Sequence, residues 1–236
     1  MLEKLIVCIV AGLGAGIGTG FAGMSAAAVI SPMLITFLGF PAYEAVGIAL
    51  ASDVLASAIS AYTYGKHKNL DVKNGIIMLI SVLVFTLVGS FIASKVPTRS
   101  MGSFSVVMTF LLGIKFLVKP VMTTKETQAD KDTRTKIIQS LLCGALIGCI
   151  CGLIGAGGGM MMLLILTSVL GYELKTAVGT SVFIMAFTAF TGAVSHFTIG
   201  GIPDIPALLL CILFTLIGAR LAARFANKAS AKTLNR

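Results

Sequence analysis

A cluster of glycines between two apolar segments is the feature of this sequence best suited to binding a ligand. Residues 152–159 read GLIGAGGG and precede the apolar run 160–170. Consecutive glycines cost about 1 kcal/mol each inside a helix, so a break is expected here. Bare backbone can approach a ligand closely, and the N–H groups that open a helix carry the positive end of its dipole. We therefore expect Gly157, Gly158 and Gly159 to contact a small anion; a plain turn is the alternative.

Hydrogen-bond donors recur near other breaks between apolar runs. Thr180 and Ser181 open the run 174–197, where a hydroxyl can either cap the helix or bind an oxyanion. A second break, in the first half of the chain, contains a glycine and a serine. The residues predicted to bind the anion together with the glycine cluster are Gly23, Ser25, Ser52, Thr180 and Ser181.

Asp53 is an ionisable residue near the middle of the long apolar run 43–64. Inside a membrane such a residue costs about 3 kcal/mol on insertion scales, so it must face protein, water or a partner. One helical face of this run carries Ala49, Asp53, Ser57, Ser60 and Tyr64. We expect Asp53 to carry a proton; a neutral, hydrogen-bonded structural aspartate and a cation site are the alternatives. His196, at the end of the run 174–197, is a second proton-carrier candidate or simply a polar helix end.

The composition identifies the chain as a polytopic membrane protein of the all-α class. Of its 236 residues 57% are hydrophobic and 11% charged, and the mean hydropathy is +1.01. Several apolar runs reach the length of about 20 residues that a helix needs to cross hydrocarbon. The net charge of +9 lies in the connections, so it indicates attraction of anionic lipid or of an anionic substrate rather than nucleic acid. The predicted spans are 3–21, 24–38, 43–64, 74–95, 101–118, 137–154, 158–170, 174–197 and 205–226.

Metal and cofactor chemistry is not expected. The five cysteines lie inside apolar segments without the spacing of metal ligands, and the chain has only two histidines. The first apolar run leads into a glycine-rich helix rather than a cleavage site, so it is expected to remain as a span.

The distribution of basic residues predicts the topology. If all nine segments cross, 15 of the 18 Lys and Arg residues lie on one side, and only Lys4, Lys95 and Arg99 lie on the other. If the segments 24–38 and 158–170 are both re-entrant, the division is 10 against 8. The positive-inside rule therefore favours nine crossings of the cell membrane, with the N-terminus outside and the C-terminus in the cytoplasm. Eight spans with one re-entrant segment stay open as an alternative, and the oligomeric state is not predicted.

An internal duplication organises the chain. At an offset of 132 residues, Gly12, Gly16, Gly20, Gly39, Ala45, Val46 and Gly47 match Gly144, Gly148, Gly152, Gly171, Ala177, Val178 and Gly179. The glycines at four-residue spacing predict close helix packing. Five crossings separate matching points, so the repeats are expected to be inverted. The first repeat is 1–118, a cytoplasmic linker covers 119–136, and the second repeat is 137–236. Such repeats with glycine-interrupted segments are typical of transporters that bind substrate at the membrane midplane.

Several of these motifs resemble a known family. The second-half motifs GLIGAGGG (152–159), AVGTS (177–181) and GAVSHFTIGGIPD (192–204), with weaker partners such as GTGFAGM (18–24), are similar to those of the TauE/SafE sulfite exporter family. The resemblance covers nearly the whole chain outside the linker. It implies a secondary transporter of small sulfur-containing anions, sulfite or organosulfonates, coupled to protons. The first repeat departs from the family pattern at two places. The family's glycine run is replaced here by Gly23-Met24-Ser25-Ala26-Ala27, and its GTS-like element is replaced by Gly47-Ile48-Ala49.

Two other functions compete with a transporter. The same glycine-lined site could serve a passive anion channel, which concentrative uptake would exclude. A membrane-embedded enzyme would need a nucleophile with a base or a metal set at membrane depth, and Asp53 is the only carboxylate placed there. We therefore expect no enzyme.

Overall fold

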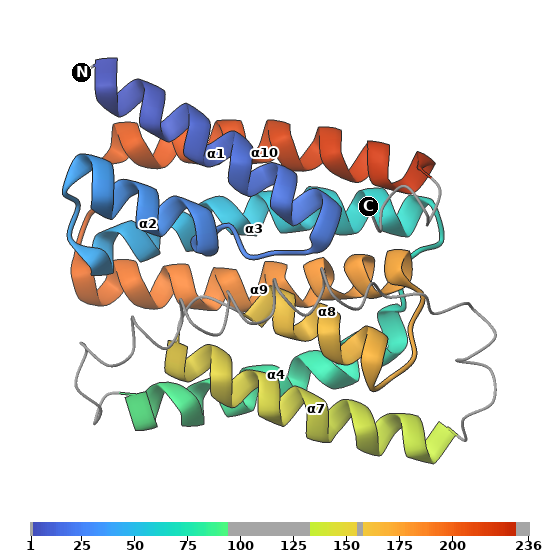
Figure 1. Ribbon diagram of the computed structural model, residues 1–236. Helices are drawn as coiled ribbons and strands as arrows, with labels where there is room; N and C mark the ends of the chain where they lie inside the picture. The colour runs from blue at the N-terminus through green and yellow to red at the C-terminus, as the bar shows by residue number, and fades with distance from the viewer. Residues whose placement is uncertain (1, 94–132, 155–157, 230–236) are drawn as a thin grey trace.

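The computed structural model describes residues 2–93, 133–154 and 158–229, and its regular structure within them is entirely helical (Figure 1). Its helices are α1 (Leu2–Ala22), α2 (Ala27–Leu38), α3 (Ala42–Lys66), α4 (Val72–Ala93), α7 (Thr133–Ile154), α8 (Gly158–Ser168), α9 (Leu174–Gly200) and α10 (Ile205–Lys228). Eight of the nine predicted segments are confirmed as helices, and the segment 101–118 lies outside the described residues. Helix α7 begins four residues before the prediction, because its first polar turn extends beyond the apolar run.

The helices differ in whether they can cross a membrane. Among the described residues, α1, α3, α9 and α10 are long and apolar enough to do so. In contrast, α2 has 12 residues and α8 has 11, a rise of about 18 and 17 Å. Hydrocarbon is about 30 Å thick, so neither short helix spans it alone. The predicted nine crossings are therefore not confirmed.

Figure 1 shows the long helices side by side in three pairs. Helix α1 packs on α10, α4 on α7, and α3 on α9. The two members of the α1–α10 pair run in the same direction, and the two members of the α4–α7 pair run in the opposite one. The short helices begin near the middle of the molecule: α2 runs from there toward one end and α8 toward the other.

Glycines set the distance between α1 and α10, as their spacing predicts. An ideal Cβ on Gly16 would overlap the carbonyl oxygen of Thr215, and one on Gly20 would lie 2.6 Å from the carbonyl oxygen of Ala219. On the other pair, a Cβ on Gly148 would lie 2.5 Å from the carbonyl oxygen of Val82. Backbone contacts this close maximise dispersion attraction where lipid provides no hydrophobic driving force.

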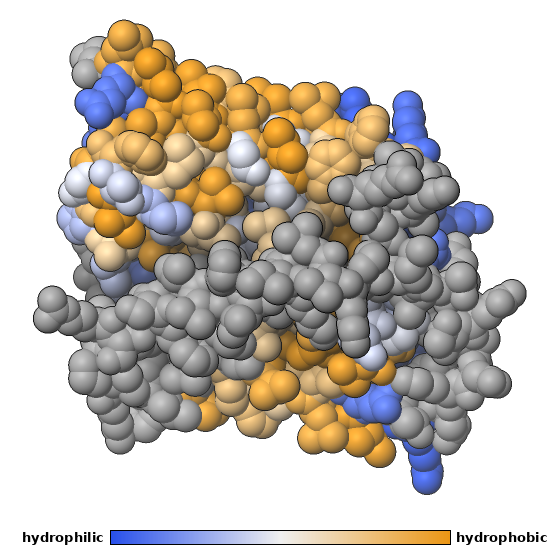
Figure 2. Space-filling model, viewed as in Figure 1, coloured by the Kyte–Doolittle hydropathy of each residue, from blue (hydrophilic) through white to orange (hydrophobic). Residues whose placement is uncertain are grey.

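Hydrophobic side chains cover the flanks of the bundle, and hydrophilic ones gather at its two ends (Figure 2). Nine of the ten described Lys and Arg residues belong to the end where α3 and α10 finish and α4, α7 and α9 begin. They are Lys66, Lys68, Lys73, Arg134, Lys136, Lys175, Arg220, Arg224 and Lys228. We call this end the basic end. The opposite end, which we call the Lys4 end, carries the tenth.

The Lys4 end is fixed by a small polar cluster. Asp204 is the N-cap of α10: its Oδ1 accepts a hydrogen bond from the Ala207 N–H (2.9 Å), and its Oδ2 pairs with Lys4. Glu44 accepts a hydrogen bond from the backbone N–H of Asp204 (2.8 Å). Burial works to raise the pKa of Asp204, but the hydrogen bonds from Lys4 and Ala207 outweigh it and leave this pKa below its usual value. The cluster joins the starts of α1, α3 and α10.

We predict that Gly16→Ala destabilises the bundle, because the added methyl group must push α1 away from α10. Overpacking of this kind costs about 1–3 kcal/mol. The matched control is Gly14→Ala, whose Cβ would have Val29 Cγ1 as its nearest neighbour at 3.7 Å. Thermal unfolding of both purified variants in detergent is the measurement. Equal melting temperatures would show that the α1–α10 contact does not depend on the glycine.

Candidate functional site

A cavity of about 430 Å³ lies between α3, α4 and α9, at the starts of α2 and α8. It extends from Ser25 and Asp53 to His196, beside the first turn of α3 at the Lys4 end. The lining residues are Ser25, Leu50, Asp53, Leu83, Val84, Thr86, Leu87, Gly158, Gly159, Met185, Thr188, Ala189, Thr191, Gly192, Ser195 and His196. Five residues predicted from the sequence therefore line one cavity: Ser25, Asp53, Gly158, Gly159 and His196.

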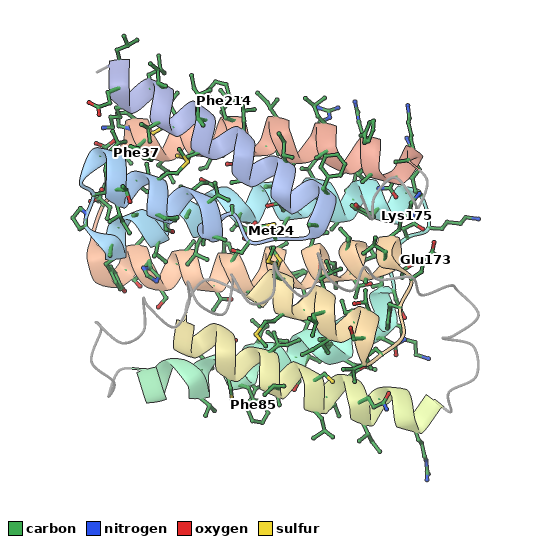
Figure 3. All side chains as sticks on the ribbon, viewed as in Figure 1. Met24, Phe37, Phe85, Glu173, Lys175 and Phe214 are labelled. Atoms are coloured by element: carbon green, nitrogen blue, oxygen red, sulfur yellow. The ribbon has the colours of Figure 1, made fainter. Side chains whose placement is uncertain are left out.

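The start of α8 meets the turn before α2 at this cavity. An ideal Cβ on Gly159 would overlap the carbonyl oxygen of Gly23, and it would lie 2.9 Å from the backbone nitrogen of Ser25 and 2.6 Å from Met185 Sδ. Figure 3 labels Met24, between Gly23 and Ser25, near the middle of the molecule where α2 and α8 begin. A side chain at position 159 would push the start of α8 away from Gly23 and Ser25, which explains the glycine. Gly23 has a φ of +60°, a conformation that favours glycine.

Asp53 forms the polar floor of the cavity. Its side chain is 1% exposed. Oδ2 accepts a hydrogen bond from Ser25 Oγ (2.8 Å), and Oδ1 accepts one from Ser57 Oγ (2.9 Å). The backbone N–H of Ala26, at the start of α2, also lies near this carboxyl group. Asp53 thus lies at the positive end of the α2 dipole, where a negative charge is favoured.

His196 lies at the other limit of the cavity. Its ring stacks on Tyr43, with 4.2 Å between the ring centroids. Nδ1 lies 3.1 Å from the carbonyl oxygen of Tyr43. Because a carbonyl oxygen can only accept, Nδ1 carries a proton, and Nε2 is the atom that gains or loses one. The side chain is therefore held in one tautomer beside the cavity.

The cavity also has hydroxyl groups that the sequence did not single out as ligands. Thr188 and Ser195 are seven residues apart on the inner face of α9, with Thr191 between them, and Thr86 faces them from α4. Thr188, Thr191 and Thr86 donate to carbonyl oxygens of their own helices, so each would have to rotate its hydroxyl hydrogen to donate to an anionic guest. The helical spacing that begins at Ser181 could have identified Thr188 and Ser195.

Charge is sparse in this cavity. Among its lining residues, all of which belong to the described part of the chain, Asp53 is the one carboxylic acid and His196 the one basic group. Aliphatic side chains from α3, α4 and α9 form most of the remaining wall. A guest would therefore be held by hydroxyl groups and backbone N–H groups rather than by Lys or Arg.

The structure places the other predicted ligands outside the cavity. Ser52 is fully buried and donates to the carbonyl oxygen of Ile48 (2.8 Å). Thr180 is fully buried and accepts a hydrogen bond from the backbone N–H of Asp71 (3.2 Å). Ser181 donates to the carbonyl oxygen of Val178 (2.9 Å), beside the backbone of Gly23. Gly23 contributes backbone next to the cavity rather than lining it, and Gly157 lies outside the described residues.

Close packing separates the cavity from the basic end. Tyr64 donates to the carbonyl oxygen of Gly20 (2.9 Å) and is 1% exposed. A Cβ on Gly179 would overlap the carbonyl oxygen of Asn69, so α9 touches the α3–α4 loop through backbone. Asn69 Nδ2 also donates to Asn227 Oδ1 (2.7 Å), which ties this loop to α10. The cavity is thus closed on the side of the basic end.

Hydrogen bonds around Asp71 hold the same closure. Asp71 Oδ2 accepts from the Tyr172 hydroxyl (2.9 Å) and from Asn74 Nδ2 (2.6 Å). With the bond from its backbone N–H to Thr180, Asp71 connects the start of α4 to α9 and to the loop before it. Thr180 therefore contributes to closure in this conformation rather than to the cavity wall.

We predict that a cysteine at position 188 reacts with a small hydrophilic methanethiosulfonate at least tenfold faster than one at position 52. Thr188 lines the cavity, whereas Ser52 is buried outside it. Both substitutions, Thr188→Cys and Ser52→Cys, are made in a background without the five native cysteines and assayed in detergent. Equal labelling rates would contradict the placement of the cavity.

Comparison with known proteins gives independent evidence about the family of the chain. The family model described as sulfite exporter TauE/SafE matches residues 8–236. The chain is 26% identical over 216 residues to the probable membrane transporter protein YdhB of Bacillus subtilis, covering 90% of this chain and 86% of that protein. A probable membrane transporter protein of Methanocaldococcus jannaschii is 27% identical over 248 residues, covering 99% and 90%. No solved structure matches the chain.

Proposed function

We propose that this chain, which belongs to the TauE/SafE sulfite exporter family, is a proton-coupled secondary transporter of a small sulfur-containing anion, sulfite or an organosulfonate. The family and the names of its relatives indicate a membrane transporter rather than an enzyme. The observation that carries the proposal is the convergence of two short-helix starts and one buried carboxyl group on a single cavity. Half-helices that begin at mid-membrane are a recurrent way to bind ions in transporters.

Equivalent helix contacts support an inverted duplication. An ideal Cβ on Gly12 would lie against Cys211 O, Phe214 Cβ and Thr215 N of α10. One on Gly148 would lie against Val82 O, Phe85 Cβ and Thr86 N of α4, the same atoms 129 residues earlier. The opposite directions of the two helix pairs are those that inversion requires. Gly12 thus corresponds in contacts to Gly148, one helical turn beyond the offset of 132. We take 1–118 and 137–236 as the repeats and 119–136 as their linker.

The basic end supports the predicted orientation. Cytoplasmic segments of membrane proteins carry an excess of Lys and Arg. With nine of ten described basic residues at one end, that end faces the cytoplasm and the Lys4 end faces outward. The N-terminus is then outside the cell membrane, and the cavity lies on the outward side of the closure formed by Tyr64, Asn69 and Asp71.

Backbone N–H groups provide the anion site. The first N–H groups of a helix have no partner within it, and those of Gly158 and Gly159 open α8 at the cavity. Ser25, before α2, and Thr188, on α9, add hydroxyl groups that would bind the anion by rotating their hydrogens away from Asp53 and from the α9 backbone. An oxyanion between these groups would be held by dipoles alone, which suits a ligand that must also be released.

Alternating access follows from the closure at the basic end. In this alternating-access scheme the described conformation would receive the anion from the Lys4 end. Rocking of one repeat against the other would break the hydrogen bonds at Asn69 and Asp71 and open the basic end. Asp53 would carry the coupled proton, and His196, at the outer limit of the cavity, would be the group that first receives it.

The test is uptake of labelled sulfite and a panel of small sulfonates into proteoliposomes, with and without an imposed pH gradient. We predict gradient-driven accumulation of at least one anion by the wild-type protein. Accumulation against a gradient excludes a passive channel. Downhill flux alone would favour the channel, and no flux for any sulfur anion would contradict the substrate class.

We further predict that Asp53→Asn abolishes accumulation driven by the pH gradient while anion exchange across the membrane continues. The amide can keep the hydrogen bond with Ser25 but cannot gain or lose a proton in the working range. Ser52→Ala is the matched control, because Ser52 neighbours Asp53 in the chain and does not line the cavity. Unchanged pH-driven accumulation in the Asn variant would remove Asp53 from proton coupling.

A further inference from the structure

The Asp53 carboxyl group already accepts a hydrogen bond from a donor that a substrate anion would also need. Ser25 Oγ donates to Asp53 Oδ2 (2.8 Å), and the Ala26 N–H at the start of α2 lies near the same carboxyl group. Ser25 and Asp53 both line the cavity. When Asp53 is ionised, the protein's own carboxylate therefore takes the place of an anionic guest at this end of the cavity.

The surrounding elements offer no compensating positive charge among the described lining residues. Helix α4 contributes Leu83, Val84, Thr86 and Leu87; α8 contributes Gly158 and Gly159; α3 adds Leu50 beside Asp53, with Ser57 as the second hydroxyl partner. Helix α9 contributes Met185, Thr188, Ala189, Thr191, Gly192, Ser195 and His196, the last being the one other titratable group. Since His196 lies at the far limit of the cavity, an anion near Ser25 would be repelled by the Asp53 carboxylate, whose charge no cationic side chain of the lining offsets.

Protonation of Asp53 removes this competition. A proton added to one carboxylate oxygen neutralises the charge and turns one acceptor into a donor. Ser25 can then rotate its hydroxyl hydrogen toward the guest, and the N–H groups at the start of α2 are no longer matched by a negative charge. Both changes favour an anion in the cavity.

We propose that the proton and the substrate anion bind together, because the Asp53 carboxylate and the anion compete for the same donors. The transporter is then a symporter in which one proton accompanies each anion, and a monovalent anion crosses without net charge. Antiport, in which the anion binds as the proton leaves, would require the carboxylate and the anion to occupy the cavity together. The proposal deepens the proposed function and rests on it.

The first experiment measures binding of methanesulfonate, a permanent monoanion, to the full-length protein in detergent between pH 5 and pH 8. The dissociation constant of the wild-type protein should rise about tenfold per pH unit above the titration of Asp53, as linkage to one proton requires. Asp53→Asn should bind with a constant that does not vary with pH, and at pH 8 at least tenfold more tightly than the wild type.

Two further variants test whether the linked proton binds to Asp53 or to His196. His196→Gln should keep the tenfold dependence of equilibrium binding, because His196 passes the proton on during transport and does not hold it while the anion is bound. Ser57→Ala should also keep it, because Asp53 retains its bond to Ser25. Gel filtration and thermal unfolding establish that each variant is folded. Loss of the pH dependence in His196→Gln but not in Asp53→Asn would overturn the proposal. Sodium-dependent affinity at constant pH would also overturn it, since Asp53 would then hold a cation.

The second experiment tests the charge that crosses. In proteoliposomes, a pH gradient should drive methanesulfonate uptake, and a potassium diffusion potential at equal pH should not. Uptake driven by the potential would overturn electroneutral symport while leaving the proposed transporter intact. Failure of the wild type to bind methanesulfonate at any pH, or affinity that improves as pH rises, would contradict the proposal. Transport of sulfite in the same preparation tells whether the proposed function fails with it.

Discussion

Backbone polar groups inside a membrane must find partners, and this requirement explains the arrangement around the cavity. Helices that begin at mid-membrane are tolerated only where their ends are buried in protein or line a cavity. The starts of α2 and α8 meet both conditions, because Gly159 in the first turn of α8 packs against Gly23 and Ser25 just before α2, and both starts adjoin the cavity. The flanking long helices then have to pack closely enough to enclose these ends, which the glycines of α1 and α7 allow.

The two half-helix starts differ in how they are satisfied, and this difference gives the site its chemistry. Beside the start of α2 the Asp53 carboxyl group accepts hydrogen bonds from Ser25 and Ser57. The residue that the offset of 132 pairs with Asp53 is Met185, which also lines the cavity and provides no charge. A related backbone framework therefore presents an acid on one side of the cavity and the start of α8 on the other, and under the proposed function a proton and an anion bind to these neighbouring places.

The sequence predicted the eight described helices and five of the sixteen residues that line the cavity, because the signals for them are local. Hydrophobic run length defined the spans, and glycine density marked the breaks at Gly158 and Gly159. The cost of an intramembrane acid singled out Asp53. Thr180 and Ser52 were predicted as ligands because a hydroxyl near a helix start can face a ligand; instead they bond to the Asp71 backbone and to Ile48. Which way a hydroxyl points depends on the rotation of its helix against its neighbours, and a single sequence does not contain that quantity. Helix packing, which the sequence does not contain, also decides the matching of the repeats. The offset of 132 pairs Gly12 with Gly144, but the contacts of Gly12 match those of Gly148, one helical turn later.

The most direct test of the account is to locate an anion in an experimental structure. Selenite has the shape and charge of sulfite, and the anomalous scattering of selenium identifies its position in crystals of the full chain grown at acidic pH. The account predicts an anomalous peak in the cavity, within hydrogen-bond distance of Ser25 Oγ and of the backbone nitrogens of Gly158 and Gly159. A selenite bound away from Asp53 and the start of α8, with this cavity empty, would contradict it.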